Sequence, residues 1–84
     1  MFKERITSKL IDAFKPTYLE VIDESHKHAG HGNFGEGNET HFQVIITADC
    51  FNGITRVNQH RMINNALSAE LNEHVHALAI VVKA

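Results

Sequence analysis

The chain has 84 residues, 43% of them hydrophobic, a size that allows a single domain over residues 1–84 with one modest core. No apolar run approaches the roughly 20 residues that a membrane-spanning helix needs, and the first residues contain no secretory signal, so we expect a soluble protein. The formal charge of −2 argues against a typical nucleic-acid binder. Cys50 is the single cysteine, which excludes an internal disulfide and agrees with a reducing compartment. The unusual count is that of histidine, which occurs seven times.

The first half of the chain predicts a helix, a strand, a long loop and a second strand. Apolar residues recur every three or four positions over residues 2 to 14, which predicts a helix that Pro16 ends. Residues 17 to 23 alternate and are rich in β-branched and aromatic types, so we predict a strand. Residues 24 to 38 contain four of the five glycines and three histidines, which indicates a long flexible loop. Alternating apolar residues then predict a second, antiparallel strand over residues 39 to 48.

The second half predicts a turn, a helical region and a third strand. Asn52-Gly53 is a turn pair and Thr55 is a suitable N-cap, so the helical region should begin near residue 55. Ile63, Leu67 and Leu71 form an apolar stripe that extends it to residue 71. His60 lies on the same stripe, and we interpret it as a packed structural residue. Residues 76 to 82 form an apolar run of the length and composition of a buried strand.

This order of elements predicts an α+β fold, with helices packed on one face of a three-stranded mixed sheet. The helical region is long enough for a right-handed crossover, so the third strand should run parallel to the second. Parallel neighbours begin at the same edge of a sheet. His76, at the start of the third strand, should therefore lie beside the loop that contains His26, His28 and His31.

Two interpretations of this group of histidines remain open. His76 and one loop histidine could form a metal site, because neutral imidazole is the commonest metal ligand in proteins. Two histidines make an incomplete site, so the missing ligands would come from a partner protein or a cofactor. Alternatively, the loop is a solvated histidine-rich tract and His76 a residue at a strand edge. Spacing alone favours this second interpretation.

Other chemically active residues give weaker signals. Arg56, Arg61 and Lys83 could form a modest basic patch near the turn at residues 52–53, although exposed charges on a helix are usually only solvated. Cys50 should lie at the far end of the second strand, away from the histidines, as a small, partly buried residue. No nucleophile elbow, phosphate-binding glycine motif or Cys-His signature is present, so we do not expect an enzyme.

Several blocks of sequence, spaced over residues 6 to 80, form a recognisable pattern. They are Glu24-Ser25, His28, NETHF at 38–42, FNG at 51–53, HRMI at 60–63, AEL at 69–71 and VHALAI at 75–80. Together they resemble the BolA-like family. The resemblance implies a class II KH-like fold with the order helix, strand, strand, helix, helix, strand, in agreement with the order of elements predicted above.

The resemblance also implies a function and a set of ligands. Members of this family associate with monothiol glutaredoxins and share a [2Fe-2S] cluster across the interface, in iron-sulfur cluster assembly, trafficking or iron regulation. The family's ligands, a histidine in the VHA block and a loop residue, match His76 and His28, and His31 offers a possible substitute for His28. The partner side contributes a glutaredoxin cysteine and a glutathione thiol. Histidine in place of thiolate raises the potential of such a cluster.

The chain departs from the family pattern in three ways. Gln59 stands where an arginine commonly precedes the His-Arg pair, the loop is longer than usual, and the chain ends soon after the third strand. The rival hypothesis is a KH-like nucleic-acid-binding transcriptional regulator that would use Arg56, Arg61 and Lys83. A KH-type RNA binder has a Gly-x-x-Gly loop, whereas residues 52–55 contain one glycine. We expect a cytoplasmic location, or the mitochondrial matrix in a eukaryote, with no membrane partner, and leave open a weak homodimer.

Overall fold

The computed structural model of the protein describes residues 2–24 and 40–83. In chain order the elements are α1 (Phe2–Phe14), β1 (Tyr18–Asp23), β2 (His41–Thr47), the short 3-10 helix η2 (Asp49–Phe51), α2 (Arg56–Ala66), α3 (Ser68–Glu73) and β3 (Ala77–Val82). His26, His28 and His31, on which part of the sequence prediction rests, lie outside the described residues. No helix in the described part of the chain is long and apolar enough to cross a membrane.

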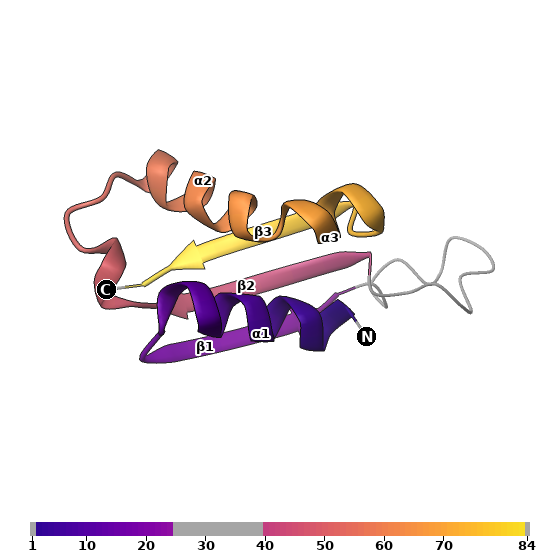
Figure 1. The fold of residues 1–84 in the computed structure, drawn as a ribbon, viewed down its shortest axis with the longest axis horizontal. Coiled ribbons are helices and arrows are strands. Elements are labelled where there is room, and N and C mark those ends of the chain that lie inside the picture. Colours follow the sequence, from indigo (N-terminus) through magenta and orange to yellow (C-terminus); the bar gives the residue numbers. More distant parts are fainter. Residues whose placement is uncertain (1, 25–39, 84) are drawn as a thin grey trace.

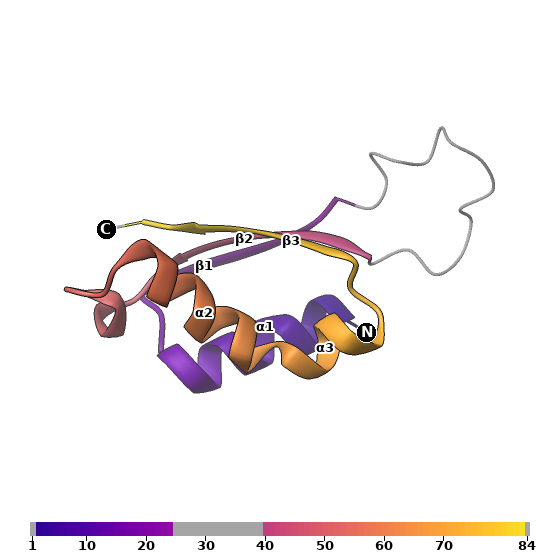
Figure 2. The ribbon, with the colours of Figure 1, turned by 90° about the horizontal axis from the view of Figure 1, so that it is seen from above.

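The three strands form one mixed sheet in the order β1-β2-β3. Strand β2 pairs antiparallel with β1 and parallel with β3, as the length of the crossover predicted. Figure 1 shows the three strands side by side, and Figure 2 shows all three α-helices on one side of the sheet. The predicted α+β fold is therefore confirmed, including the direction of every strand.

The core lies between the sheet and this helical layer. From β2, the alternate residues Phe42, Val44 and Ile46 are buried, which is the face that their spacing predicted. Helix α1 covers them with a stripe of buried residues at intervals of four, Ile6, Leu10 and Phe14. The helical region between β2 and β3 adds a second buried stripe, Ile63 and Leu67. Because each fully buried aliphatic or aromatic side chain contributes roughly 1.5–3 kcal/mol, these stripes supply most of the driving force for folding.

The helical region is divided into two helices, as the family resemblance implied, whereas apolar periodicity alone predicted one stretch ending at residue 71. Thr55 is the N-cap of α2, as predicted, and its hydroxyl accepts a hydrogen bond of 3.3 Å from the Asn58 amide. The break falls at Leu67, whose φ of −104° and ψ of 17° depart from helical values while its side chain stays buried. Helix α3 then continues to Glu73, and its buried residue is Glu70. Because Glu70 places a carboxylate on the inner side of α3, apolar periodicity did not predict this last turn.

Candidate functional site

The start of β3 lies beside the start of β2, at the edge of the sheet that is formed by the ends of the strands. Ala77 is in register with His41, and the amides of His76 and Ala77 both donate to the Thr40 carbonyl, at 2.7 and 3.1 Å. At the same edge, the Glu24 amide donates to the His41 carbonyl at 2.7 Å. Residues 24 and 40, which bound the histidine-rich segment, therefore meet next to His76. The parallel pairing of β2 with β3 produces this arrangement, as the sequence argument expected.

His76 combines a fixed backbone with an exposed side chain. Its ring lies beside that of His41, with 6.4 Å between the ring centroids and 28° between the ring planes. His41 is half-buried, and its Nδ1 lies 2.8 Å from the Thr40 hydroxyl, a hydrogen bond that orients the ring. The sequence analysis assigned His41 no role. The parallel register was the signal that could have placed it beside residue 76.

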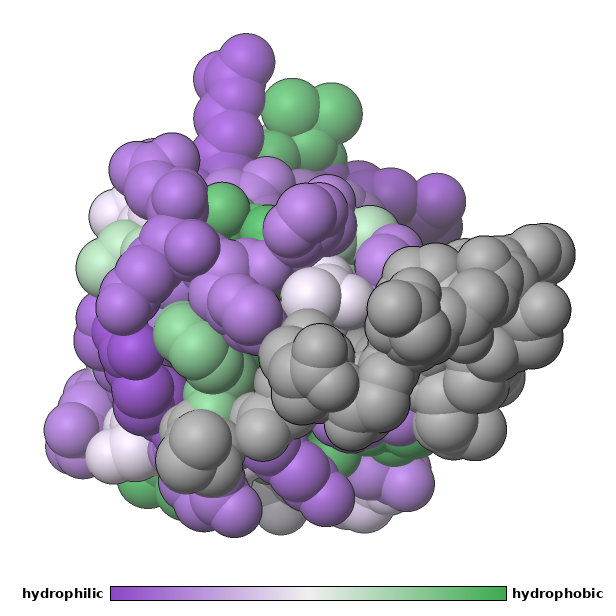
Figure 3. Space-filling model, turned by 90° about the vertical axis from the view of Figure 1, so that its right-hand side faces the viewer, coloured by the Kyte–Doolittle hydropathy of each residue, from purple (hydrophilic) through white to green (hydrophobic). Residues whose placement is uncertain are grey.

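A second set of contacts ties the turn before His76 to the beginning of α1. The rings of Phe2 and His74 are stacked, with centroids 4.7 Å apart and planes 14° apart. The Arg5 guanidinium lies over the Phe2 ring, 4.6 Å from its centroid. Figure 3 views this end of the molecule, where the visible described surface is mainly hydrophilic with small separate apolar areas. The imidazole of His74 is thus part of the packing between α1 and the turn from α3 to β3.

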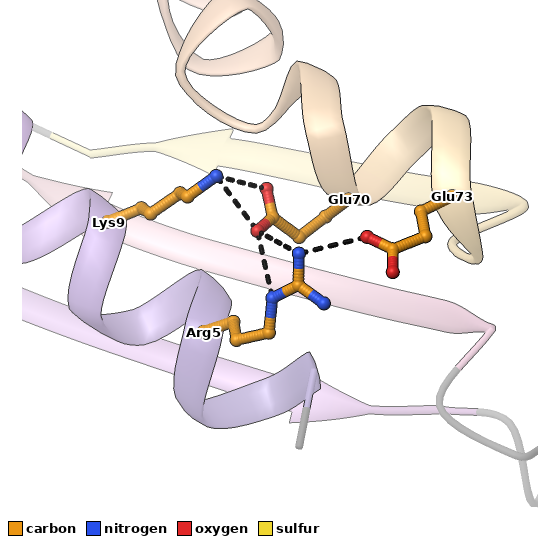
Figure 4. Close-up of polar contacts among 4 residues, drawn as sticks. All are labelled: Arg5, Lys9, Glu70 and Glu73. Carbon is orange, nitrogen blue, oxygen red and sulfur yellow. Dashed lines mark hydrogen bonds and ion pairs between the residues drawn. The ribbon is translucent and has the colours of Figure 1, made fainter.

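The largest feature that sequence reasoning missed is a charged cluster between α1 and α3 (Figure 4). The Glu70 side chain is only 1% exposed, and both of its oxygens contact the Lys9 ammonium at 2.9 Å. Arg5 contacts Glu70 at 3.0 Å and Glu73 at 3.0 Å. Burial opposes ionisation of Glu70, but the hydrogen bond from Lys9 and the charges of Lys9 and Arg5 outweigh it and hold the pKa of this carboxyl below its usual value.

The same residue fixes the chain that leads to His76. The backbone carbonyl of Glu70 accepts hydrogen bonds from the amides of His74 at 3.0 Å and Val75 at 2.9 Å, which ends α3. Val75 is buried, so the next residue leaves the core at a defined point. The position of His76 therefore depends on the helical layer as well as on the sheet.

The described residues do not form a self-contained group of metal ligands. No group of three or more His, Cys, Asp or Glu residues within 2–24 and 40–83 could hold a metal ion. The exposed imidazole of His76 suits iron or zinc, but a complete site needs ligands from elsewhere. The other predicted ligand, His28, and its substitute His31 fall outside the described residues.

The remaining candidates lie toward the opposite end of the sheet. Arg56 begins α2, Arg61 lies one turn further along, and Lys83 follows β3; all three side chains are exposed. Cys50 belongs to η2, beyond the far end of β2 from His41, and it is exposed where the sequence suggested a partly buried residue. His60 is half-buried and lines a groove between α2 and β3, so it lies at the margin of the core.

Comparison with known proteins identifies the family. The family model described as "BolA-like protein" matches residues 10–84. The chain belongs to the BolA-like family. It is 48% identical over 80 residues to the DNA-binding transcriptional regulator BolA of Escherichia coli (strain K12), an alignment that covers 95% of this chain and 72% of that protein.

Solved structures agree with this assignment. The BolA domain of SufE1 from Arabidopsis thaliana superimposes with a TM-score of 0.86 at 43% identity, over 98% of this chain and 90% of that one. BolA1 from Arabidopsis thaliana gives a TM-score of 0.87 at 37% identity, over 96% of this chain and 88% of that one. The resemblance seen in the sequence blocks is therefore confirmed at the level of the family and of the fold.

Proposed function

We propose that this BolA-like protein pairs with a monothiol glutaredoxin and helps to bind a [2Fe-2S] cluster shared across the interface. Its ligands would be His76 and one histidine of the neighbouring segment, His28, with His31 as the substitute. A glutaredoxin cysteine and a glutathione thiol would complete the set. The role is non-enzymatic and lies in iron-sulfur cluster assembly, trafficking or iron regulation.

The observation that supports this proposal best is the environment of His76. Its backbone is held by the Thr40 carbonyl, its side chain is exposed, and residues 24 and 40 bring both ends of the histidine-rich segment to the same edge. In the proposal, the ligands that complete the set come from the histidine-rich segment and from the partner. A shared metal site needs ligands from a partner, whereas a self-contained metalloprotein does not.

When bound, the cluster would supply electron-transfer or cluster-donor chemistry, and the residues of this chain would set its surroundings. Neutral imidazole donates less charge to iron than thiolate does, which raises the reduction potential of a histidine-ligated cluster. The Thr40 hydroxyl orients the His41 ring beside His76. Through these contacts His41 would help to orient the imidazole of His76 that would hold the cluster.

The test is anaerobic mixing of the chain with a monothiol glutaredoxin, glutathione, iron and sulfide, followed by visible circular dichroism. His76→Ala should abolish the spectrum of the mixed complex, and His28→Ala should weaken it, with rescue by His31. His60→Ala is the matched control, since it removes an imidazole at the other end of β3 and should leave the spectrum unchanged. Cys50→Ser should also have no effect. Calorimetry should show that the cluster-free complex still forms with every variant.

Two outcomes would contradict the assignment. A spectrum identical to that of the glutaredoxin homodimer would mean that the chain contributes no ligand. Loss of the signal in His41→Ala, with a normal signal in His28→Ala, would transfer the second ligand from the loop segment to β2.

A second function has one specific observation in its favour. The Escherichia coli relative at 48% identity is named a DNA-binding transcriptional regulator. For this chain, the net charge of −2 and the small exposed basic set of Arg56, Arg61 and Lys83 favour cluster binding over nucleic-acid binding. Regulation through nucleic acid is therefore the weaker proposal.

A further inference from the structure

Strand β3 is an edge strand of the sheet that the described residues form. The amides of Ala77 and Lys83 donate to carbonyls of the β2 side, those of Thr40 and Ile46, at 3.1 and 2.9 Å. In a parallel ladder, alternate residues direct both backbone groups to the same neighbour, so the residues between them direct theirs to the outer edge. These residues are Leu78, Ile80 and Val82. Their amides and carbonyls form a template on which a further strand can pair.

Helix α2 lies next to the outer edge of β3, and a groove runs between the two elements. Figure 1 shows α2 along the margin of the sheet beyond β3, and Figure 2 places it in the helical layer. The groove between them has a volume of about 230 Å³ and is lined by Arg56, Gln59 and His60 of α2 and by Ile80, Val81 and Val82 of β3. An edge strand flanked by a helix is the arrangement with which several domain types bind extended peptides by strand addition.

The polar groups of the groove favour an acidic occupant. Both amide hydrogens of Gln59 are engaged, since Nε2 donates to the carbonyls of Phe51 at 3.1 Å and Ile54 at 3.0 Å. Arg56 and His60 therefore provide the groove's available donors. In the described part of the chain, Arg56 makes no ion pair, whereas Arg5 and Lys9 are both paired with Glu70. The exposed Arg61 and Lys83 add positive charge nearby.

We propose that the groove between α2 and β3 binds an extended acidic peptide, which adds as a fourth strand to β3. The peptide backbone pairs with Leu78, Ile80 and Val82, and a carboxylate binds Arg56 through charge-assisted hydrogen bonds. Apolar side chains on the same face of the peptide as this carboxylate contact Ile80 and Val82, which are only half-buried. Single-stranded nucleic acid is a poorer match, because its sugar-phosphate backbone has no amides and carbonyls to pair with Leu78, Ile80 and Val82, and only Arg56 and His60 of the lining residues could stack on a base.

This binding site goes beyond the proposed cluster function, because the lining of the groove, from Arg56 and His60 to Ile80 and Val82, lies toward the end of β3 away from His76. An extended chain rises about 3.3 Å per residue, so His76 and Val82 are separated by roughly 20 Å. The groove could hold a segment of a third protein while His76 is in use. Each of the two proposals can therefore fail without the other.

The experiment titrates the ¹⁵N-labelled chain with an acetylated and amidated octapeptide, Val-Thr-Glu-Thr-Val-Thr-Glu-Thr, in which valine and glutamate lie on one face of an extended strand. Saturable shifts should appear at the amides of Leu78, Ile80 and Val82. Arg56→Glu should weaken the affinity about tenfold, whereas Arg61→Glu, with the same charge change on the same helix but outside the groove, should alter it less than about threefold. Arg56→Glu places a carboxylate in the first turn of α2, which the helix dipole favours, so the fold should be retained.

Three comparisons can overturn the proposal. Two versions of the peptide are methylated on one or the other alternate set of backbone nitrogens; only the set that faces β3 should abolish binding, and equal binding of both versions would exclude strand addition. Stronger shifts of the same amides with an oligodeoxythymidine of equal charge would assign the groove to nucleic acid. Shifts that change on dilution without peptide would assign it to a second copy of this chain. Absence of any saturable shift at millimolar peptide would also refute the proposal.

Discussion

Replacing Glu70 by glutamine should destabilise the fold more than any other change of a single charge in the described helices. The Glu70 side chain is 1% exposed, while its partners Arg5 and Lys9 are 41% and 42% exposed. Breaking a fully buried ion pair costs about 3–5 kcal/mol, and breaking a surface pair costs about 0–1 kcal/mol. Since only the acidic partner is buried here, we expect Glu70→Gln to lower the free energy of unfolding by about 2 kcal/mol.

Thermal unfolding provides the first assay. Unfolding entropy is about 2.1 cal/mol/K per residue, which for 84 residues converts 2 kcal/mol into a fall in Tm of about 11 °C. Glu73→Gln is the matched control, because Glu73 contacts the same Arg5 at 3.0 Å but its side chain is 57% exposed. Its loss should stay below about 0.5 kcal/mol, or about 3 °C.

The dependence on pH provides an independent check. The folded-state pKa of Glu70 lies below its usual value of 4.5, so its ionised form is favoured by folding. The stability that it contributes is fully present above pH 4.5 and is lost as pH falls through the lower folded-state pKa. The difference in free energy of unfolding between the wild-type chain and Glu70→Gln should therefore become smaller as pH falls from 7 to 3. A difference that widens in this range, or equal effects of Glu70→Gln and Glu73→Gln at pH 7, would refute the reasoning.

Two further predictions concern α2 and the basic residues. Thr55→Ala should lower the free energy of unfolding, measured with urea, by about 1 kcal/mol, because it removes the hydroxyl that accepts a hydrogen bond from the Asn58 amide. Thr55→Ser should retain most of the stability, and equal losses in the two variants would argue against the cap. Nucleic-acid binding should be weak and should disappear as salt rises to the physiological range, as measured by fluorescence anisotropy, because few exposed basic residues are available. Tight, sequence-selective binding at that salt concentration would instead favour the regulator function.

The parts of the fold that follow from local periodicity could be predicted from the sequence. Phe42, Val44 and Ile46 alternate because β2 has one buried face, and Ile6 and Leu10 are four residues apart because α1 has one buried stripe. The parallel direction of β3 followed from the length of the crossover and brought His76 to the correct edge. Each of these inferences rests on a constraint that acts over a short stretch or on chain connectivity.

The charged cluster could not be predicted in this way. Glu70 interrupts the apolar pattern, and a carboxylate at such a position is usually assigned to the surface. Its burial is explained only by Arg5 and Lys9, which are more than 60 positions away in the chain and carry no local signal of the contact. His41 was missed for a different reason: its position follows from the register of β2 and β3, which local patterns specify less well than strand direction.

The contacts around His76 connect the charged cluster of Arg5, Lys9, Glu70 and Glu73 to the candidate site. The Thr40 carbonyl holds the His76 amide from the side of the sheet, and the Glu70 carbonyl holds the two preceding amides from the side of the helices. The backbone at residue 76 has therefore lost its conformational freedom on folding, before any partner arrives. A ligand that is already positioned binds with a smaller entropic cost than one that must be ordered on association. Under the proposed function, His76 would be the ligand that is already positioned before association, so we expect its loss to be the hardest to compensate.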